Sequence, residues 1–160
     1  MGKERFPSTP ATRFLKEKGV PFELHSYKYE EHGGTEKSSR DLGVDETFVV
    51  KTIVMEDDRH NPFIVLMHGN LQISAKEMAR FMGTKSVSLC DPEKAHKITG
   101  YLVGGTSPFG TRRKLPVYIE SSILELSRIY INAGSRGLLA AMSPRDLRRV
   151  LEPVPVSVGR

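Results

Sequence analysis

Two apolar stretches joined by a short charged segment place the strongest constraint on the fold of this 160-residue chain. Residues 48–55 (FVVKTIVM) and 62–68 (PFIVLMH) are rich in β-branched and apolar side chains, which favours strands. The segment between them, 56–61, is polar and too short for the crossover that a parallel pair needs. The sequence therefore predicts an α+β fold with a mixed or antiparallel sheet, rather than a doubly wound parallel sheet.

Start and stop signals for further elements lie on both sides of this pair. Thr9-Pro10 combines a hydroxyl N-cap with proline at the first helical position, and Gly19 can end that helix. Residues 74–77 (SAKE) fit a capping box. We expect helices at 10–18, 75–82, from 92 onward, and 144–150. We expect further strands at 22–27, 87–89, 116–120, 129–132 and 138–142, with 71–73 as a continuation of the sheet.

The chain is predicted to form one domain that includes all of these elements. The polar segment 28–41 fits either a short helix ending at Gly43 or a mobile loop over a site. No internal repeat or linker divides the sequence. We therefore expect a single domain over residues 9–152, with terminal tails at 1–8 and 153–160.

Composition narrows the class of protein and its compartment. The chain is 38% hydrophobic and 27% charged with a net charge of +5, which favours phosphate-bearing partners without the charge density of a histone-like protein. Its single cysteine, Cys90, excludes a disulfide within the chain and is expected to be buried. No signal peptide is evident, and the longest apolar run, 63–67, is too short to span a membrane. We expect a soluble cytoplasmic protein.

A glycine-rich segment, residues 100–110 (GYLVGGTSPFG), is the most distinctive motif. It fits two interpretations equally: a stiff ligand-binding loop with accessible amides, or a tight connection between strands. Thr111-Arg112 stands where a P-loop needs Lys and then Ser or Thr. Pro108 removes an amide that a nucleophile elbow would need. Neither of these two known sites is present.

Charged residues supply the remaining candidates. Lys51 interrupts an otherwise apolar strand, which indicates either a lysine on the exposed face of an edge strand or one that projects into a pocket. Arg136, in a second glycine turn at 133–137, is either an exposed turn residue or an anion ligand. The basic run Arg112, Arg113 and Lys114 is either a solvated flank or a contact for an RNA backbone. The five histidines show no metal-ligand spacing, so no metal or catalytic triad is expected.

Taken together, these motifs resemble the YbaK/EbsC family of aminoacyl-tRNA deacylases, whose domain is related to the editing insertion of bacterial prolyl-tRNA synthetases. The resemblance rests on residues 50–52 (VKT), on 99–110 followed by Leu115-Pro116, and on 134–137 (GSRG). Within the family the chain is most similar to the branch that clears cysteine mischarged on proline tRNA.

The resemblance implies an α+β fold with a mixed, partly barrel-like sheet and peripheral helices. It implies hydrolysis of the ester that joins an amino acid to the tRNA 3′ end, with Lys51 as the catalytic residue and no cofactor. The partners implied are the 3′ end of aminoacyl-tRNA and prolyl-tRNA synthetase, and not DNA. The implied substrate-binding residues are Tyr27, Thr52, Gly104, Gly105, Thr106, Ser107, Pro108, Gly110, Asn132, Gly134, Arg136 and Gly137.

A mechanism can be outlined on this basis. Amides of residues 104–107 would stabilise the charge that develops on the ester carbonyl oxygen, and Lys51 would hold the terminal phosphate or ribose. No side chain is a convincing nucleophile, so water or the substrate's own thiol would attack. Leu139 occupies a position that is acidic in many relatives, which bears on amino-acid specificity. The alternative is a non-catalytic module of the same fold that binds a small molecule or tRNA.

Overall fold

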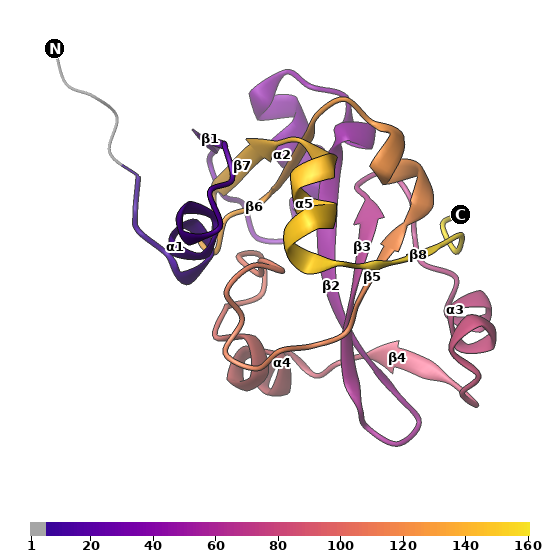
Figure 1. Ribbon diagram of the computed structural model, residues 1–160. Helices are drawn as coiled ribbons and strands as arrows, with labels where there is room; N and C mark the ends of the chain where they lie inside the picture. Colours follow the sequence, from indigo (N-terminus) through magenta and orange to yellow (C-terminus); the bar gives the residue numbers. More distant parts are fainter. Residues whose placement is uncertain (1–5) are drawn as a thin grey trace, which may run out of the picture.

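A computed structural model describes residues 6–160, which form a mixed sheet with helices around it (Figure 1). The sheet has eight strands in the order β1-β7-β6-β2-β3-β5-β8, and β4 pairs with β2 outside this path. The strands are β1 (Glu23–Ser26), β2 (Val49–Asp57), β3 (Pro62–His68), β4 (Val87–Leu89), β5 (Val117–Glu120), β6 (Ile129–Asn132), β7 (Leu138–Met142) and β8 (Val154–Val156). The prediction of an α+β fold is confirmed.

The hairpin of β2 and β3 forms the centre of the sheet, as the sequence predicts. The two strands are antiparallel, with register from Val50 opposite His68 to Glu56 opposite Pro62. The Asp57 carboxylate closes the turn by accepting hydrogen bonds from the amides of Arg59 and Asn61. The sheet is mixed because β2–β6, β3–β5 and β5–β8 are parallel pairs, whereas the other pairs are antiparallel.

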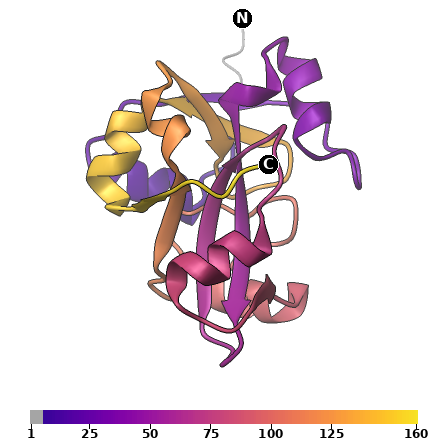
Figure 2. The same cartoon turned by 90° about the vertical axis from the view of Figure 1, so that its right-hand side faces the viewer.

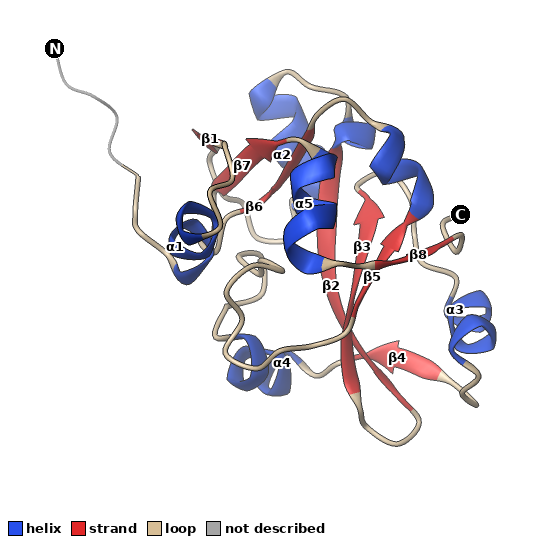
Figure 3. Ribbon diagram, viewed as in Figure 1, coloured by secondary structure: helices blue, strands red, loops and turns tan. Residues whose placement is uncertain are grey.

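Helices begin where the sequence signals them. Thr9 forms a reciprocal capping box with Thr12 at the first helix, and the Ser74 hydroxyl caps the third. The segment 28–41 contributes a helix that ends at Gly43. The helices are α1 (Pro10–Glu17), α2 (Gly34–Leu42), α3 (Ala75–Met82), α4 (Pro92–Thr99) and α5 (Pro144–Leu151), with short 3₁₀ turns η1 (Glu46–Phe48) and η2 (Ser121–Glu125) (Figure 3). Within residues 6–160, none of these helices has the length and apolarity to cross a membrane.

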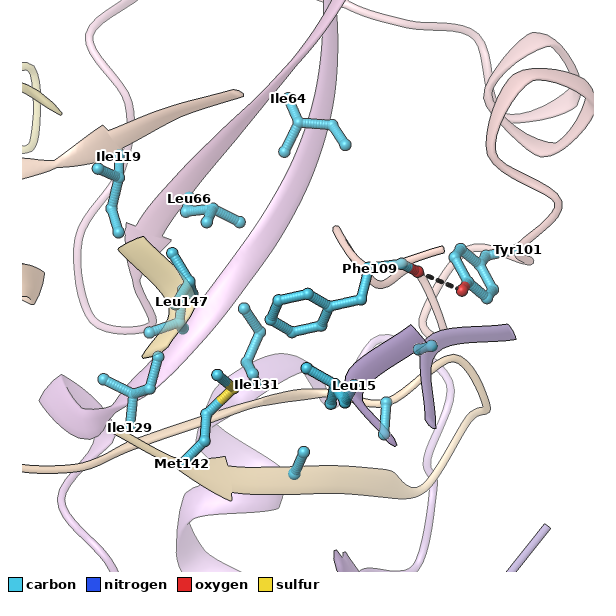
Figure 4. Close-up of a cluster of buried hydrophobic side chains, with 14 of the residues drawn as sticks. Leu15, Ile64, Leu66, Tyr101, Phe109, Ile119, Ile129, Ile131, Met142 and Leu147 are labelled. Carbon is cyan, nitrogen blue, oxygen red and sulfur yellow. Dashed lines mark hydrogen bonds between the residues drawn. The ribbon is translucent and has the colours of Figure 1, made fainter. Parts of the chain in front are cut away.

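Side chains that alternate along the central hairpin build two cores, one on each side. Val50 and Val54 of β2 belong to the larger core. Leu15 of α1 and Leu147 of α5 belong to the same core (Figure 4). Met55 contributes to the smaller core under α3. In the view turned by 90°, α5 and α2 lie on opposite sides of the sheet (Figure 2). Odd and even positions of β2 therefore face different surroundings.

The C-terminal residues correct one expectation. Residues 153–160 are not a tail, because β8 pairs with β5 and the side chains of Val156 and Val158 are buried. The Glu120 carboxylate accepts hydrogen bonds from the amides of Val158 and Gly159 at 2.8 and 2.9 Å. A proline is tolerated in β8 because this strand is at the edge of the sheet. Of the expected N-terminal tail, residues 1–5 lie outside the described residues, and residues 6–8 form no helix or strand.

Candidate active site

A local break in the sheet exposes one side of β2 at the sequence motif VKT. β6 pairs with β2 only at Val49 and Val50, and β4 pairs with it only from Met55 onward. Between these ladders, residues 51–53 have β3 on one side and no described strand on the other. Lys51 therefore belongs to an interior strand of the sheet, at a point where that strand is paired on one side only.

Lys51 is a half-buried cation without an acidic partner. Its Nζ donates a hydrogen bond to the carbonyl oxygen of Leu71, in the connection between β3 and α3. No carboxylate in residues 6–160 lies within ion-pair distance of this ammonium. Burial lowers the pKa of Lys51, and the negative charge of Glu46 acts in the opposite direction. Such a group can exchange a backbone carbonyl for an anionic or carbonyl oxygen of a ligand.

The sequence analysis missed Glu46, whose charge acts on this lysine, and Thr35, which contacts Glu46. The Thr35 hydroxyl of α2 lies 2.6 Å from Glu46 Oε2 and 3.1 Å from the carbonyl oxygen of Gly69. A Cβ at Gly69 would lie 2.7 Å from the Thr35 hydroxyl, so this close approach requires glycine. The start of α2 is thereby tied to η1 and to the end of β3. Sequence spacing gives no signal for contacts between segments so far apart.

The two glycine-rich segments interlock beside the break. Asn132 lies one residue beyond the Val50–Ile131 pair, next to Lys51 in the register. Its Nδ2 donates hydrogen bonds to the carbonyl oxygens of Gly104 and Ser135 at 3.1 and 3.3 Å, and its Oδ1 accepts one from the Gly134 amide at 2.7 Å. Asn132 thus holds residues 100–110 and 133–137 together.

Arg136 and Gly105 complete the contact between these segments. Arg136 Nε donates a hydrogen bond of 2.8 Å to the carbonyl oxygen of Val103. A Cβ at Gly105 would lie 2.9 Å from the Arg136 backbone nitrogen, so a side chain there would push the segments apart. The structure therefore brings Asn132, Arg136, Gly104 and Gly105 together near Lys51.

Two tyrosines border the same cluster. The Tyr27 amide donates a hydrogen bond of 2.9 Å to the carbonyl oxygen of Gly137, and burial raises the pKa of the Tyr27 hydroxyl. Tyr29, which the sequence analysis missed, lies under the Arg136 guanidinium at 5.1 Å from its ring centroid. A Cβ at Gly104 would lie 2.8 Å from the Tyr29 ring. Tyr29 is visible in the sequence only as a second tyrosine close to Tyr27.

Other residues of the glycine segment face inward and support its shape. Ser107 is fully buried, and its hydroxyl accepts a hydrogen bond of 3.2 Å from the Phe109 amide. The Tyr101 hydroxyl donates to the Phe109 carbonyl oxygen (Figure 4). Pro108 is buried, Gly110 packs against the start of α1, and Gly134 packs against Tyr101. These side chains stabilise the segment from the inside.

The expectation that the amides of residues 104–107 are all accessible is wrong in part. The Gly105 amide donates a hydrogen bond of 2.8 Å to the Leu102 carbonyl oxygen, so it is not accessible to a ligand. The Thr106 hydroxyl bonds to the same oxygen at 3.3 Å. The turn that brings Gly105 close to residue 136 uses this amide. Among the described residues, the amides of Gly104, Thr106 and Ser107 have no acceptor, and Ser107 is fully buried.

Thr52 and the basic run lie apart from the cluster around Lys51. Thr52 points to the other face of β2, and its hydroxyl is buried without a hydrogen-bond partner in residues 6–160. Arg112, Arg113 and Lys114 are exposed just after the glycine segment. Arg112 returns beside that segment, because its Nε lies 3.1 Å from where a Cβ at Gly100 would be.

Most of the chain matches a known protein family. The family model described as "Aminoacyl-tRNA editing domain" matches residues 30–150. The chain belongs to this family. The matched range contains α2, the break at Lys51 and both glycine segments of the editing domain.

Relatives of the editing domain agree with this placement. The chain is 27% identical over 146 residues to EbsC of Enterococcus faecalis, which is named as a Cys-tRNA(Pro)/Cys-tRNA(Cys) deacylase; the match covers 91% of this chain and 89% of EbsC. It is 26% identical to a proline–tRNA ligase of Thermodesulfovibrio yellowstonii, over 71% of this chain and 18% of the ligase. A crystal structure described as a trans-editing enzyme for prolyl tRNA synthetase superposes with a TM-score of 0.84 at 18% identity, over 97% of this chain and 99% of the other. This last likeness concerns the fold.

Proposed function

We propose that this protein hydrolyses the ester of mischarged aminoacyl-tRNA, with Cys-tRNA(Pro) as its principal substrate. Family membership and the name of EbsC support the reaction and the substrate. The observation that carries the proposal is the half-buried Lys51 ammonium, which lacks an acidic partner in residues 6–160 and lies beside the interlocked glycine segments. A negatively charged RNA end would supply the missing partner.

Lys51 would act by position and charge. Its ammonium would leave the Leu71 carbonyl oxygen and bind the terminal phosphate or ribose, which fixes the ester relative to the glycine segment. The free amides of Gly104 and Thr106 would then stabilise the oxyanion that forms when the ester carbonyl is attacked. This assignment replaces the row of four amides expected from the sequence.

The attacking group would come from water or from the substrate. Cys90 is buried, and burial raises the pKa of its thiol. Ser107 is fully buried. With water, a new bond to the carbonyl carbon forms, the ester bond breaks, and the released tRNA hydroxyl takes a proton. With the cysteine thiol of the substrate, the sulfur attacks the same carbon, the tRNA hydroxyl leaves with the proton, and water opens the cyclic thioester.

The identity of the tRNA would be read in part by a partner. The matching stretch of the proline–tRNA ligase is one part of a much longer protein. We therefore propose that prolyl-tRNA synthetase hands mischarged tRNA to this domain in the cytoplasm. The net charge of +5 would favour the RNA at short range.

The test is a deacylation assay on Cys-, Ala- and Pro-tRNA(Pro) and on Cys-tRNA(Cys). We expect the wild-type protein to release cysteine from tRNA(Pro) fastest. Lys51→Ala should reduce kcat/KM by about 100-fold or more, because a misplaced ester loses that much rate. Lys76→Ala, which removes an exposed lysine of α3, is the matched control and should retain the activity.

Two outcomes would contradict the proposal. Full activity of Lys51→Ala, with an unchanged unfolding midpoint, would remove the role of this lysine. No ester loss on any charged tRNA, with tRNA binding intact, would favour the non-catalytic module instead.

A further inference from the structure

The tip of the glycine segment exposes two adjacent apolar side chains beside the candidate site. Leu102 is 53% exposed and Val103 is 54% exposed. Burying such surface is favourable, so a rigid apolar tip in solvent marks a place where a ligand gains by contact. These two residues face outward immediately before Gly104, whose carbonyl oxygen is bound by Asn132.

Hydrogen bonds hold this tip in one conformation. The Leu102 carbonyl oxygen accepts from the Gly105 amide at 2.8 Å and lies 3.3 Å from the Thr106 hydroxyl. The Val103 carbonyl oxygen accepts from Arg136 Nε at 2.8 Å. A preorganised surface loses little entropy when it binds a ligand, which distinguishes it from a floppy apolar loop.

Positive charge lies beside the tip and at the start of the same segment. Arg136 is exposed and its guanidinium is stacked over Tyr29. Arg112 lies against Gly100, at the start of the same segment. Neither arginine has an ion-pair partner among the described residues, nor do Arg113 and Lys114. An apolar platform close to unpaired cations is complementary to a nucleotide, which has a flat apolar base and an anionic phosphate.

Continuity with the site around Lys51 identifies which nucleotide fits. The terminal adenosine of tRNA carries the aminoacyl ester, so its base must lie close to the site where the ester is held. We propose that Leu102, Val103 and the Arg136 guanidinium form the platform on which the 3′-terminal adenine of tRNA stacks, with Arg112 facing the phosphates that precede it. This inference rests on the proposed function, because it takes aminoacyl-tRNA as the substrate of the neighbouring site.

The experiment compares two uncharged transcripts of tRNA(Pro), one ending in CCA and one lacking the terminal adenosine. Dissociation constants are measured by fluorescence anisotropy at one fixed low salt concentration, because phosphate contacts depend strongly on salt. We expect the wild-type protein to bind the CCA transcript about fivefold or more tightly, which is the contribution of one stacked base. The double variant Leu102→Ser, Val103→Ser should bring this ratio to about one.

Leu89→Ser is the matched control, since Leu89 is 70% exposed on β4 and lies outside the glycine segment. It should keep the wild-type ratio. Unfolding midpoints of both variants should equal that of the wild type, because only exposed side chains change. The variant Arg136→Lys keeps the charge but loses the planar group, and it should lower the ratio as well.

Several results would overturn the inference. These are a wild-type ratio of one, no measurable binding of either transcript, or an unchanged ratio in the double variant. A double variant that changes only the oligomeric state would show that the tip is a contact between copies of the chain. The transcripts carry no ester, so their binding is measured independently of the reaction. A protein that deacylates but binds both transcripts equally would contradict this inference alone. A protein that prefers the CCA transcript but does not deacylate would contradict the proposed function alone.

Discussion

The two parts of the glycine segment, residues 100–110, differ in what they contact. Tyr101 and Phe109 are buried in the larger core and residues 107–108 are buried beside them in the sequence, whereas residues 102–104 are exposed beside the turn 133–137. The glycines that border these parts also meet different neighbours. Gly110 approaches α1, and Gly105 approaches Arg136. One motif thus contains a part that determines folding and a part that shapes the candidate site.

The largest expected effect is on stability, at the buried end. Gly110 has φ of +65°, and a Cβ there would lie 2.5 Å from the Pro10 carbonyl oxygen. We expect Gly110→Ala to lower the free energy of unfolding by about 4 kcal/mol, because backbone must move to admit the methyl group. Urea denaturation measures this loss.

Gly83→Ala is the control that measures the cost of backbone strain without a steric contact. Gly83 has φ of +73° and nothing within 4 Å of its Cβ position. Its substitution should cost about 1 kcal/mol, the penalty of the left-handed conformation. Equal losses in the two variants would show that the approach of Gly110 to α1 does not matter.

An intermediate effect on activity is expected at Gly105, where the segment contacts the turn 133–137. Gly105→Val would place a branched side chain against the backbone of residues 135 and 136, where a Cβ already lies 2.9 Å from the Arg136 nitrogen. We expect kcat/KM for Cys-tRNA(Pro) to fall by about 100-fold, because the amides near the ester would be displaced. The accompanying loss of stability should stay well below that of Gly110→Ala. Normal turnover with valine at this position would mean that the ester binds elsewhere.

The smallest effect concerns a hydroxyl within the buried part of the segment. Tyr101 donates to the Phe109 carbonyl oxygen, so Tyr101→Phe should cost about 1 kcal/mol. Burial raises the pKa of Tyr101 to about 12. In the unfolded chain this hydroxyl ionises near its ordinary value of 10.0, so the wild type should lose stability as the pH rises from 10 to 12.

The phenylalanine variant tests the origin of that loss. It has no proton to release at this position, so the decline between pH 10 and 12 should be smaller than in the wild type. Unfolding curves recorded at several pH values compare the two proteins. Identical declines would assign the loss to other groups.

The sequence predicted the fold where local signals agree. The β2–β3 hairpin has two apolar runs around a polar turn, and the helix caps at Thr9 and Ser74 are local contacts. β8 escaped prediction because Pro155 within it and Pro153 before it are typical of a loop, although Val154, Val156 and Val158 alternate as in a strand. Its pairing partner, β5, lies far away in the sequence.

The candidate site was predictable only in part, for a related reason. Lys51 stood out because a charge interrupts an apolar strand, and the glycine segments stood out by composition. Thr35, Glu46 and Tyr29 did not, because their contacts join distant segments. The use of the Gly105 amide within its own turn also depends on a conformation that glycine permits but does not dictate.

The attachment of the C-terminal residues has a consequence for synthesis on the ribosome. Glu120 receives the amides of Val158 and Gly159, and Gly159 bridges to Ile73 before α3. These partners are translated long before residue 159 leaves the exit tunnel. The β5 edge and the residues before α3 therefore stay incompletely paired until translation has passed this point. An early stop codon would leave apolar surface of the smaller core exposed, where chaperones could bind it.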